Sequence, residues 1–101
     1  MANASSKVRI GIIGCGGIAN GKHMPSLKRL PKVEMVAFCD IVIERAEAAK
    51  KHYGTEDAKV YTDYKKLLED KTIDAVHVCT PNRSHSFITV DALEAGKHVM
   101  C

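Results

Sequence analysis

The sequence predicts an α/β protein with a doubly wound parallel sheet, and three observations support this fold class. Short apolar runs alternate with amphipathic segments along the chain. The apolar runs hold few polar residues, which is typical of parallel strands buried on both faces. A glycine-rich turn joins the first apolar run to the segment after it. Alternating strands and helices are joined by right-handed crossovers, so we expect the strand order 3-2-1-4-5, ending before a sixth strand.

Length and composition limit the class of protein. The 101 residues form one domain at most, and the net charge of +3 comes from basic residues scattered over predicted helix surfaces. We therefore expect no nucleic-acid partner. The start of the chain is too short and polar for a signal peptide, and no apolar run is long enough to span a membrane. Four widely spaced cysteines fit reduced thiols in a cytoplasmic protein with no metal site.

The first strand, Val8 to Ile13, leads directly into Gly14-Cys15-Gly16-Gly17-Ile18-Ala19. A strand followed by this glycine pattern and a helix is typical of dinucleotide-binding proteins, because it directs free backbone N–H groups and the helix N-terminus at one point. Gly14 permits the tight turn, and Gly16 lets a pyrophosphate approach the backbone. A flexible turn with no ligand is the alternative.

A second feature supports the dinucleotide interpretation. The strand Val33 to Cys39 ends on Asp40, and a carboxylate at this position accepts the ribose hydroxyls of an adenosine. Asp40 would repel the additional phosphate of NADP, and Arg45 is the nearest arginine after it. NAD is therefore the expected cofactor, with NADP disfavoured without being excluded.

The first half of the chain contains two predicted helices. Residues 1–6 form a polar tail. The first helix begins near Gly17, is interrupted at Pro25 and continues to Leu30, with Leu27 and Leu30 facing inward. The second helix runs from Ile43 to Tyr53 with an alanine stripe facing the core, and Gly54 ends it.

The second half repeats the alternation. A minimal strand at Val60–Tyr61 precedes a short helix capped by Thr62 or Asp63, which carries Tyr64, Leu67 and Leu68. We expect a strand from Ile73 to Cys79, a helix from Ser84 to Ala95 ended by Gly96, and a last strand from Lys97 to Cys101. His77 lies within the first of these strands, and we expect it to hydrogen-bond against a covering helix rather than bind a ligand.

These elements bring three segments to one crevice at the carboxyl ends of the strands. The glycine turn, Asp40 and Thr80–Asn82 all lie where the strand order reverses, which is the usual ligand site of such sheets. All four cysteines are predicted at the same edge. A metal cluster is conceivable there, but we favour small apolar residues that line the cofactor site.

The motifs resemble one known family. The segments GCGGIA, FCD, VYTDYKKLL, IDAVHVCTPNRSH and ALEAGKHVMC together are similar to the N-terminal Rossmann domain of the glucose-fructose oxidoreductase, inositol dehydrogenase and MocA family. The resemblance covers residues 8–101. It implies NAD(P)-dependent hydride transfer on sugars, cyclitols and related alcohols, and a second domain that binds substrate and forms a homo-oligomer.

The resemblance also implies residue roles. It places the cofactor against Gly14, Cys15, Gly16, Gly17, Ile18, Asp40, Thr80, Pro81, Asn82 and His85. No catalytic residue is assigned, because the family's lysine belongs to a Glu-Lys-Pro segment that would follow Cys101. Lys97 lies at the opposite end of its strand from the crevice. We therefore expect residues 7–101 to be a cofactor-binding domain that is inactive by itself.

Two other functions use the same features. A non-catalytic module that senses dinucleotides would need the same pocket, and only residues beyond Cys101 would separate it from an enzyme. A methyltransferase-like domain could place S-adenosylmethionine on a glycine loop and a strand-end acid. The Thr80–Asn82 segment and Ala19 favour the two dinucleotide functions over the third.

Overall fold

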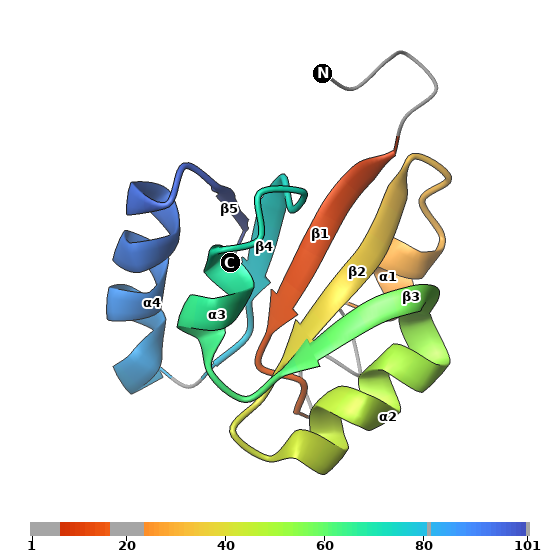
Figure 1. The fold of residues 1–101 in the computed structure, drawn as a ribbon, viewed down its shortest axis with the longest axis horizontal. Helices are drawn as coiled ribbons and strands as arrows, with labels where there is room; N and C mark the ends of the chain where they lie inside the picture. The colour runs from red at the N-terminus through yellow and green to blue at the C-terminus, as the bar shows by residue number, and fades with distance from the viewer. Residues whose placement is uncertain (1–6, 17–23, 81, 101) are drawn as a thin grey trace.

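The computed structural model describes residues 7–16, 24–80 and 82–100. Its five strands form one parallel sheet with the order β3-β2-β1-β4-β5, which confirms the predicted fold class (Figure 1). The elements are β1 (Val8–Ile13), α1 (Met24–Lys28), β2 (Val33–Cys39), α2 (Ile43–Tyr53), β3 (Gly54–Tyr61), α3 (Tyr64–Leu68), β4 (Ala75–Val78), α4 (Asn82–Glu94) and β5 (His98–Met100).

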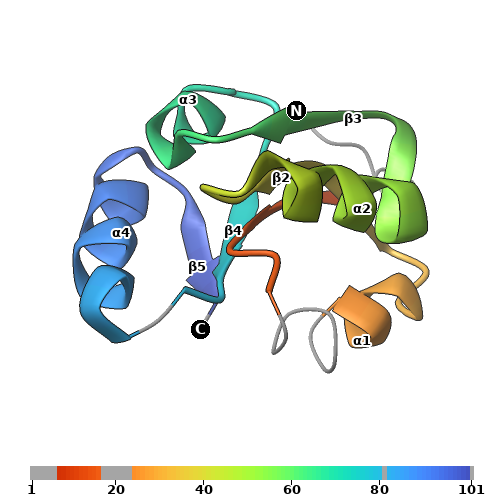
Figure 2. The same ribbon diagram turned by 90° about the horizontal axis from the view of Figure 1, so that it is seen from below.

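Helices cover both faces of the sheet, with α1 and α2 on one side and α3 and α4 on the other (Figure 2). The side chains of neighbouring β1 residues point to opposite faces of the sheet, because side chains alternate along a strand. Ile12 packs with α1 and α2, whereas Ile13 packs with α3 and α4. Phe38 is fully buried in the first of these cores and Val76 in the second. Two apolar layers therefore fix the strand ends that form the site.

Several predicted elements are confirmed. The bounds of β2 and α2 match the predicted ranges, and Ala46 and Ala49 are buried on α2. Asp63 caps α3 by accepting a hydrogen bond from the Lys65 N–H at 2.9 Å. Gly96 ends the helical region with φ +81°, the left-handed conformation that glycine adopts at low cost.

The third strand is longer than predicted. It spans Gly54–Tyr61, whereas the predicted strand covered only Val60–Tyr61. The charged residues Glu56, Asp57 and Lys59 hid it, because they lie exposed on an edge strand while Ala58 between them is buried. Gly54 begins this strand in an extended conformation (φ −81°) rather than as a left-handed cap.

Other bounds also differ. The helix α1 ends at Lys28, so Leu30 lies in the following turn and is 48% exposed; its predicted inward position is wrong, whereas Leu27 is buried. The strand β4 is shorter than predicted, β5 begins at His98 rather than Lys97 while its predicted end at Cys101 lies outside the described residues, and α4 begins two residues early, at Asn82. The predicted start of the first helix and the tail lie outside the described residues.

Candidate cofactor-binding site

Gly14 lies between the ends of three strands. Its N–H donates to the Cys39 carbonyl at 2.8 Å, and its φ is +93°. A Cβ at this position would lie 2.9 Å from the Cys79 carbonyl carbon and 3.0 Å from the Thr80 nitrogen. A side chain would therefore both strain the turn and push β1 away from the end of β4. Only glycine allows the three strand ends to meet.

Asp40, directly after β2, is directed toward the glycine turn. Its Oδ2 accepts a hydrogen bond from the Cys15 N–H at 2.9 Å, and its Oδ1 accepts one from the Val42 N–H at 2.8 Å. Its own N–H donates to the Tyr61 carbonyl at 3.1 Å. Each carboxylate oxygen has two lone pairs, so each can still accept a hydroxyl. The side chain is thus held in place for a diol and has capacity to bind one.

Gly16 presents an open face at the same turn. Among the described residues other than its chain neighbours, the heavy atom within 4 Å of a Cβ added to Gly16 is Arg45 Nη1, at 3.9 Å, and this atom belongs to a long side chain. No other described side chain therefore blocks the close approach to Gly16 that a pyrophosphate requires.

Thr80 adds a polar group from the third segment. Its Oγ1 is buried and has no hydrogen-bond partner among the residues that the structure describes. Buried hydroxyls are nearly always satisfied in proteins, so a hydroxyl without a partner at the carboxyl ends of the strands fits one that bonds to a ligand. The glycine cradle, the fixed carboxylate and this hydroxyl all suit a dinucleotide.

The structure brings together five of the predicted site residues: Gly14, Cys15, Gly16, Asp40 and Thr80. Gly17, Ile18 and Pro81 lie outside the described residues. Asn82 and His85 belong to the first turns of α4, where only the backbone is described. Sequence reasoning missed the contact between Asp40 and Val42. An aspartate that accepts from the N–H two residues later is a common turn, and this signal could have identified the contact.

The cysteines at this edge are packing groups. Cys15 and Cys39 are buried, and the Cys15 thiol donates to the Cys39 carbonyl at 3.5 Å. Burial, reinforced by the Asp40 charge, raises the pKa of each thiol to about 12. Both are therefore protonated at neutral pH and are poor nucleophiles. Within the described ranges no three His, Cys, Asp or Glu side chains are grouped to hold a metal ion.

A glycine turn and a ribose-type carboxylate at the switch point of a parallel sheet define a dinucleotide-binding Rossmann domain. The family model described as "Oxidoreductase family, NAD-binding Rossmann fold" matches residues 8–101. The chain belongs to this family, that of glucose-fructose oxidoreductase, inositol dehydrogenase and MocA, as the resemblance indicated.

Individual relatives agree with this assignment. The chain is 41% identical over 100 residues to the D-glucoside 3-dehydrogenase of Escherichia coli K12, covering 99% of this chain and 28% of that enzyme. It is similar to the structure of myo-inositol dehydrogenase from Lactobacillus casei in complex with NAD(H) and myo-inositol (TM-score 0.83, 38% identity, 92% of this chain and 27% of that one).

A third relative binds the other nicotinamide cofactor. This is KijD10, a 3-ketoreductase from Actinomadura kijaniata in complex with NADP and TDP-benzene (TM-score 0.85, 33% identity, 93% of this chain and 28% of that one). The chain thus spans less than a third of the length of these relatives. No helix among the residues that the structure describes is long and apolar enough to cross a membrane.

Proposed function

We propose that this chain is the cofactor-binding domain of an oxidoreductase that transfers hydride between a nicotinamide dinucleotide and a sugar, cyclitol or related alcohol. The observation that carries the proposal is the fixed position of Asp40. Two backbone N–H groups, from Cys15 and Val42, hold its carboxylate against the glycine turn. A preorganised carboxylate binds a ribose diol without the cost of ordering a free side chain.

In this proposal different residues bind different parts of the cofactor. Gly14 and Gly16 let the pyrophosphate approach the backbone, and Cys15 contributes a backbone position rather than its thiol. Asp40 accepts the hydroxyls of the adenosine ribose, and the Thr80 hydroxyl bonds toward the nicotinamide-side ribose. The same assignment includes Gly17, Ile18, Pro81, Asn82 and His85. When bound, the nicotinamide supplies a hydride donor or acceptor, and the protein's part is placement.

NAD is the preferred cofactor in this proposal, because the Asp40 carboxylate repels a phosphate on the adenosine ribose. The relatives include an NAD(H) complex and an NADP complex. Both ligands are nicotinamide dinucleotides, and in this proposal the choice between NAD and NADP depends on the charges around the adenosine ribose. Both oxygens of Asp40 accept from backbone N–H groups, which partly offset its charge. We therefore expect Asp40 to weaken the binding of NADP without abolishing it.

The rest of the protein's properties follow from the family. We propose that the substrate binds largely outside this domain, that the whole protein is a cytoplasmic homo-oligomer, and that residues 7–101 alone do not turn over substrate. Mixing the chain with NAD⁺ and myo-inositol should produce no increase in NADH absorbance. Steady NADH production would show that the proton-transfer group lies within this chain.

The direct test of the proposal is a titration with NADH, followed by nicotinamide fluorescence. Asp40→Ala should weaken NADH binding by about tenfold or more, because hydrogen bonds to a charged group are worth about 1.5–3 kcal/mol. Glu56→Ala, which removes an exposed acid from β3, serves as the matched control. Circular dichroism checks that both variants are folded. No response of the wild-type chain to NADH, or equal affinity in the Asp40 variant, would refute the proposal.

A further inference from the structure

A cavity of about 570 Å³ lies at the amino edge of the sheet, where the parallel strands begin. Three segments of the chain line it: the start of β1, the loop before β4 and the turn between α4 and β5 (Figure 1). Its volume falls within the range of small-molecule sites, about 300–1,000 Å³. The function proposed above does not use this cavity, because the cofactor residues lie at the opposite ends of the strands.

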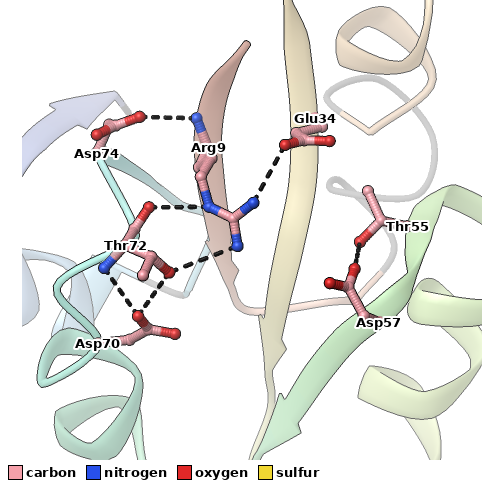
Figure 3. A network of polar contacts seen from close by, with 7 residues as sticks. All are labelled: Arg9, Glu34, Thr55, Asp57, Asp70, Thr72 and Asp74. Carbon is pink, nitrogen blue, oxygen red and sulfur yellow. Dashed lines mark hydrogen bonds and ion pairs between the residues drawn. The ribbon is translucent and has the colours of Figure 1, made fainter. Parts of the chain in front are cut away.

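The lining of the cavity is basic. Lys7, Lys71 and Lys97 contribute three positive charges and Asp74 one negative charge, which leaves a formal charge of +2 with the lining histidine counted as neutral. The Oδ2 atom of Asp74 accepts a hydrogen bond from the Arg9 N–H at 3.0 Å (Figure 3). A concave surface with an excess of one charge attracts ligands of the opposite charge. The cavity is therefore suited to an anion.

Lys97 is the buried cation of this lining. It is 8% exposed, and its Nζ donates to the Asp70 carbonyl at 2.6 Å and to the Ile73 carbonyl at 2.8 Å. An ammonium group has three N–H donors, and the third of Lys97 has no acceptor among the described residues. The ion pair recorded in the described ranges joins Arg9 to Glu34, so no described carboxylate is paired with Lys97. A buried charge without a counter-charge is costly, and an anionic ligand would supply one.

The shape and charge of the cavity favour an organic phosphate. Val8, which is 43% exposed at the start of β1, gives the lining an apolar wall that the carbon body of a ligand would cover. A phosphate monoester carries a charge of about −1.5 to −2 near neutral pH, which matches the lining. The two phosphates of a dinucleotide each carry a single charge and are enclosed between two nucleosides, so they fit this cavity less well.

We propose that the cavity at the amino edge binds a small organic phosphate monoester, with the phosphate among the lysines and the carbon body against Val8. Lysine binds phosphate as a point charge. Lys7 and Lys71 are exposed at the rim and approach the phosphate from solvent, whereas Lys97 approaches it from the protein interior. The ligand would join the three segments that line the cavity. This proposal is independent of the cofactor site.

The test is a titration of the ¹⁵N-labelled chain in phosphate-free buffer, followed by NMR. Phenyl phosphate should shift the amide signals of Lys71, Gly96 and His98 to saturation and leave those of Cys15 and Gly16 in place. Phenyl sulfate has a similar shape with one negative charge fewer, so it should bind about fivefold more weakly. Inorganic phosphate, which lacks the carbon body, should also bind more weakly. Saturating NADH should not displace phenyl phosphate.

Variants identify the lysines that bind the ligand. Lys71→Gln removes an exposed charge from the lining and should weaken phenyl phosphate binding about fivefold. Lys51→Gln removes an exposed charge from α2 and is the matched control, with unchanged affinity. Lys97→Met should weaken binding about tenfold or more, because a buried donor is lost. Circular dichroism checks that each variant is folded.

Several outcomes would overturn the proposal. They are an affinity for phenyl phosphate that Lys71→Gln leaves unchanged, and equal affinities for phenyl phosphate, phenyl sulfate and inorganic phosphate, which would indicate attraction of any anion. Shifts gathered at the glycine turn, or displacement by NADH, would place the ligand in the cofactor site instead. These results are obtained separately from the NADH titration of the wild-type chain, so the proposed function is tested independently.

Discussion

The two edges of the sheet treat polar groups in opposite ways. At the amino edge, side chains bond to each other and to loops (Figure 3). Arg9 donates through Nη1 to Glu34 at 3.2 Å and through Nε to the Thr72 carbonyl at 3.0 Å. Its N–H donates to Asp74 Oδ2 at 3.0 Å. At the carboxyl edge, among the described residues, Asp40 accepts from two backbone N–H groups, and the Thr80 hydroxyl has no partner.

Lys97 extends the closed network at the amino edge. It is 8% exposed, and its ammonium group donates to the Asp70 carbonyl at 2.6 Å and to the Ile73 carbonyl at 2.8 Å. Burial lowers its pKa, although Asp70 and Asp74 oppose this effect. The amine therefore ties the α3–β4 loop to the start of β5.

This difference between the two edges separates residues that stabilise the fold from residues that are available to the cofactor. Hydrogen bonds that close on themselves hold loops together and leave little for a ligand, whereas open donors and acceptors are costly unless a ligand satisfies them. Substitutions at the amino edge should therefore lower the free energy of unfolding and spare cofactor affinity. Substitutions at the carboxyl edge should change both.

The largest effect is expected for Gly14→Ala. Left-handed backbone strain of about 1–2 kcal/mol adds to overpacking of about 1–3 kcal/mol, because the new Cβ would meet Cys79 and Thr80. We expect the free energy of unfolding to fall by about 3 kcal/mol and NADH binding to be lost. Denaturant unfolding and NADH titration measure the two effects.

Gly96→Ala is the matched control at the amino edge. Gly96 has φ +81°, but no atom of the part of the chain that the structure describes lies within 4 Å of its added Cβ. It should lose only about 1 kcal/mol from strain and bind NADH normally. Similar losses of unfolding free energy and of NADH binding in both variants would show that Gly14 is needed only for the conformation of the turn.

The next effect is expected for Lys97→Met. The methionine retains the apolar stem but leaves the Asp70 and Ile73 carbonyls without the ammonium donor, which costs about 2 kcal/mol in unfolding free energy. NADH affinity should not change. Lys71→Met, at an exposed neighbouring position, should stay within about 0.5 kcal/mol of the wild type. Weaker NADH binding by the Lys97 variant would contradict the separation of the two edges.

The smallest effect is expected for Asp70→Asn. Hydrogen bonds from Thr72 lower the pKa of Asp70, so its carboxylate stabilises the fold above the ordinary value of 3.8 and loses this contribution as pH falls through the lower folded value. The variant should lose less than about 1 kcal/mol at pH 7, because solvent screens the site. Its difference from the wild type should shrink near pH 3. Urea unfolding at both pH values measures this, and a constant difference would exclude the carboxylate as its cause.

Local patterns predicted much of the fold. The apolar run of β2 and the alanine stripe of α2 were sufficient for their bounds, because both signals lie within one element. The charged first part of the third strand was not predicted beyond Val60–Tyr61, since its stability depends on pairing with β2. The place of Lys97 at the start of its strand predicted that it lies away from the crevice. The sequence did not predict that its side chain is buried. That burial depends on the Asp70 and Ile73 carbonyls, which approach it only in the folded chain.

The candidate site was likewise predictable from the sequence only in part. The glycine pattern and Asp40 were found because their spacing is fixed by a strand and a turn. The hydrogen bond from Cys15 to Asp40 joins residues from two strand ends, and the position of Arg45 against Gly16 depends on how α2 packs. Neither contact has a signal in the spacing of residues.

The most direct test is NMR of the ¹⁵N-labelled chain during NADH titration. We expect the amide signals of Cys15, Gly16 and Thr80 to shift strongly, and those of Arg9 and Lys97 to remain in place. The amino edge offers a competing location, a cavity of about 570 Å³ lined in part by Asp74, Lys97 and His98. Shifts gathered around that cavity, with the glycine turn unaffected, would contradict a dinucleotide site at the carboxyl edge.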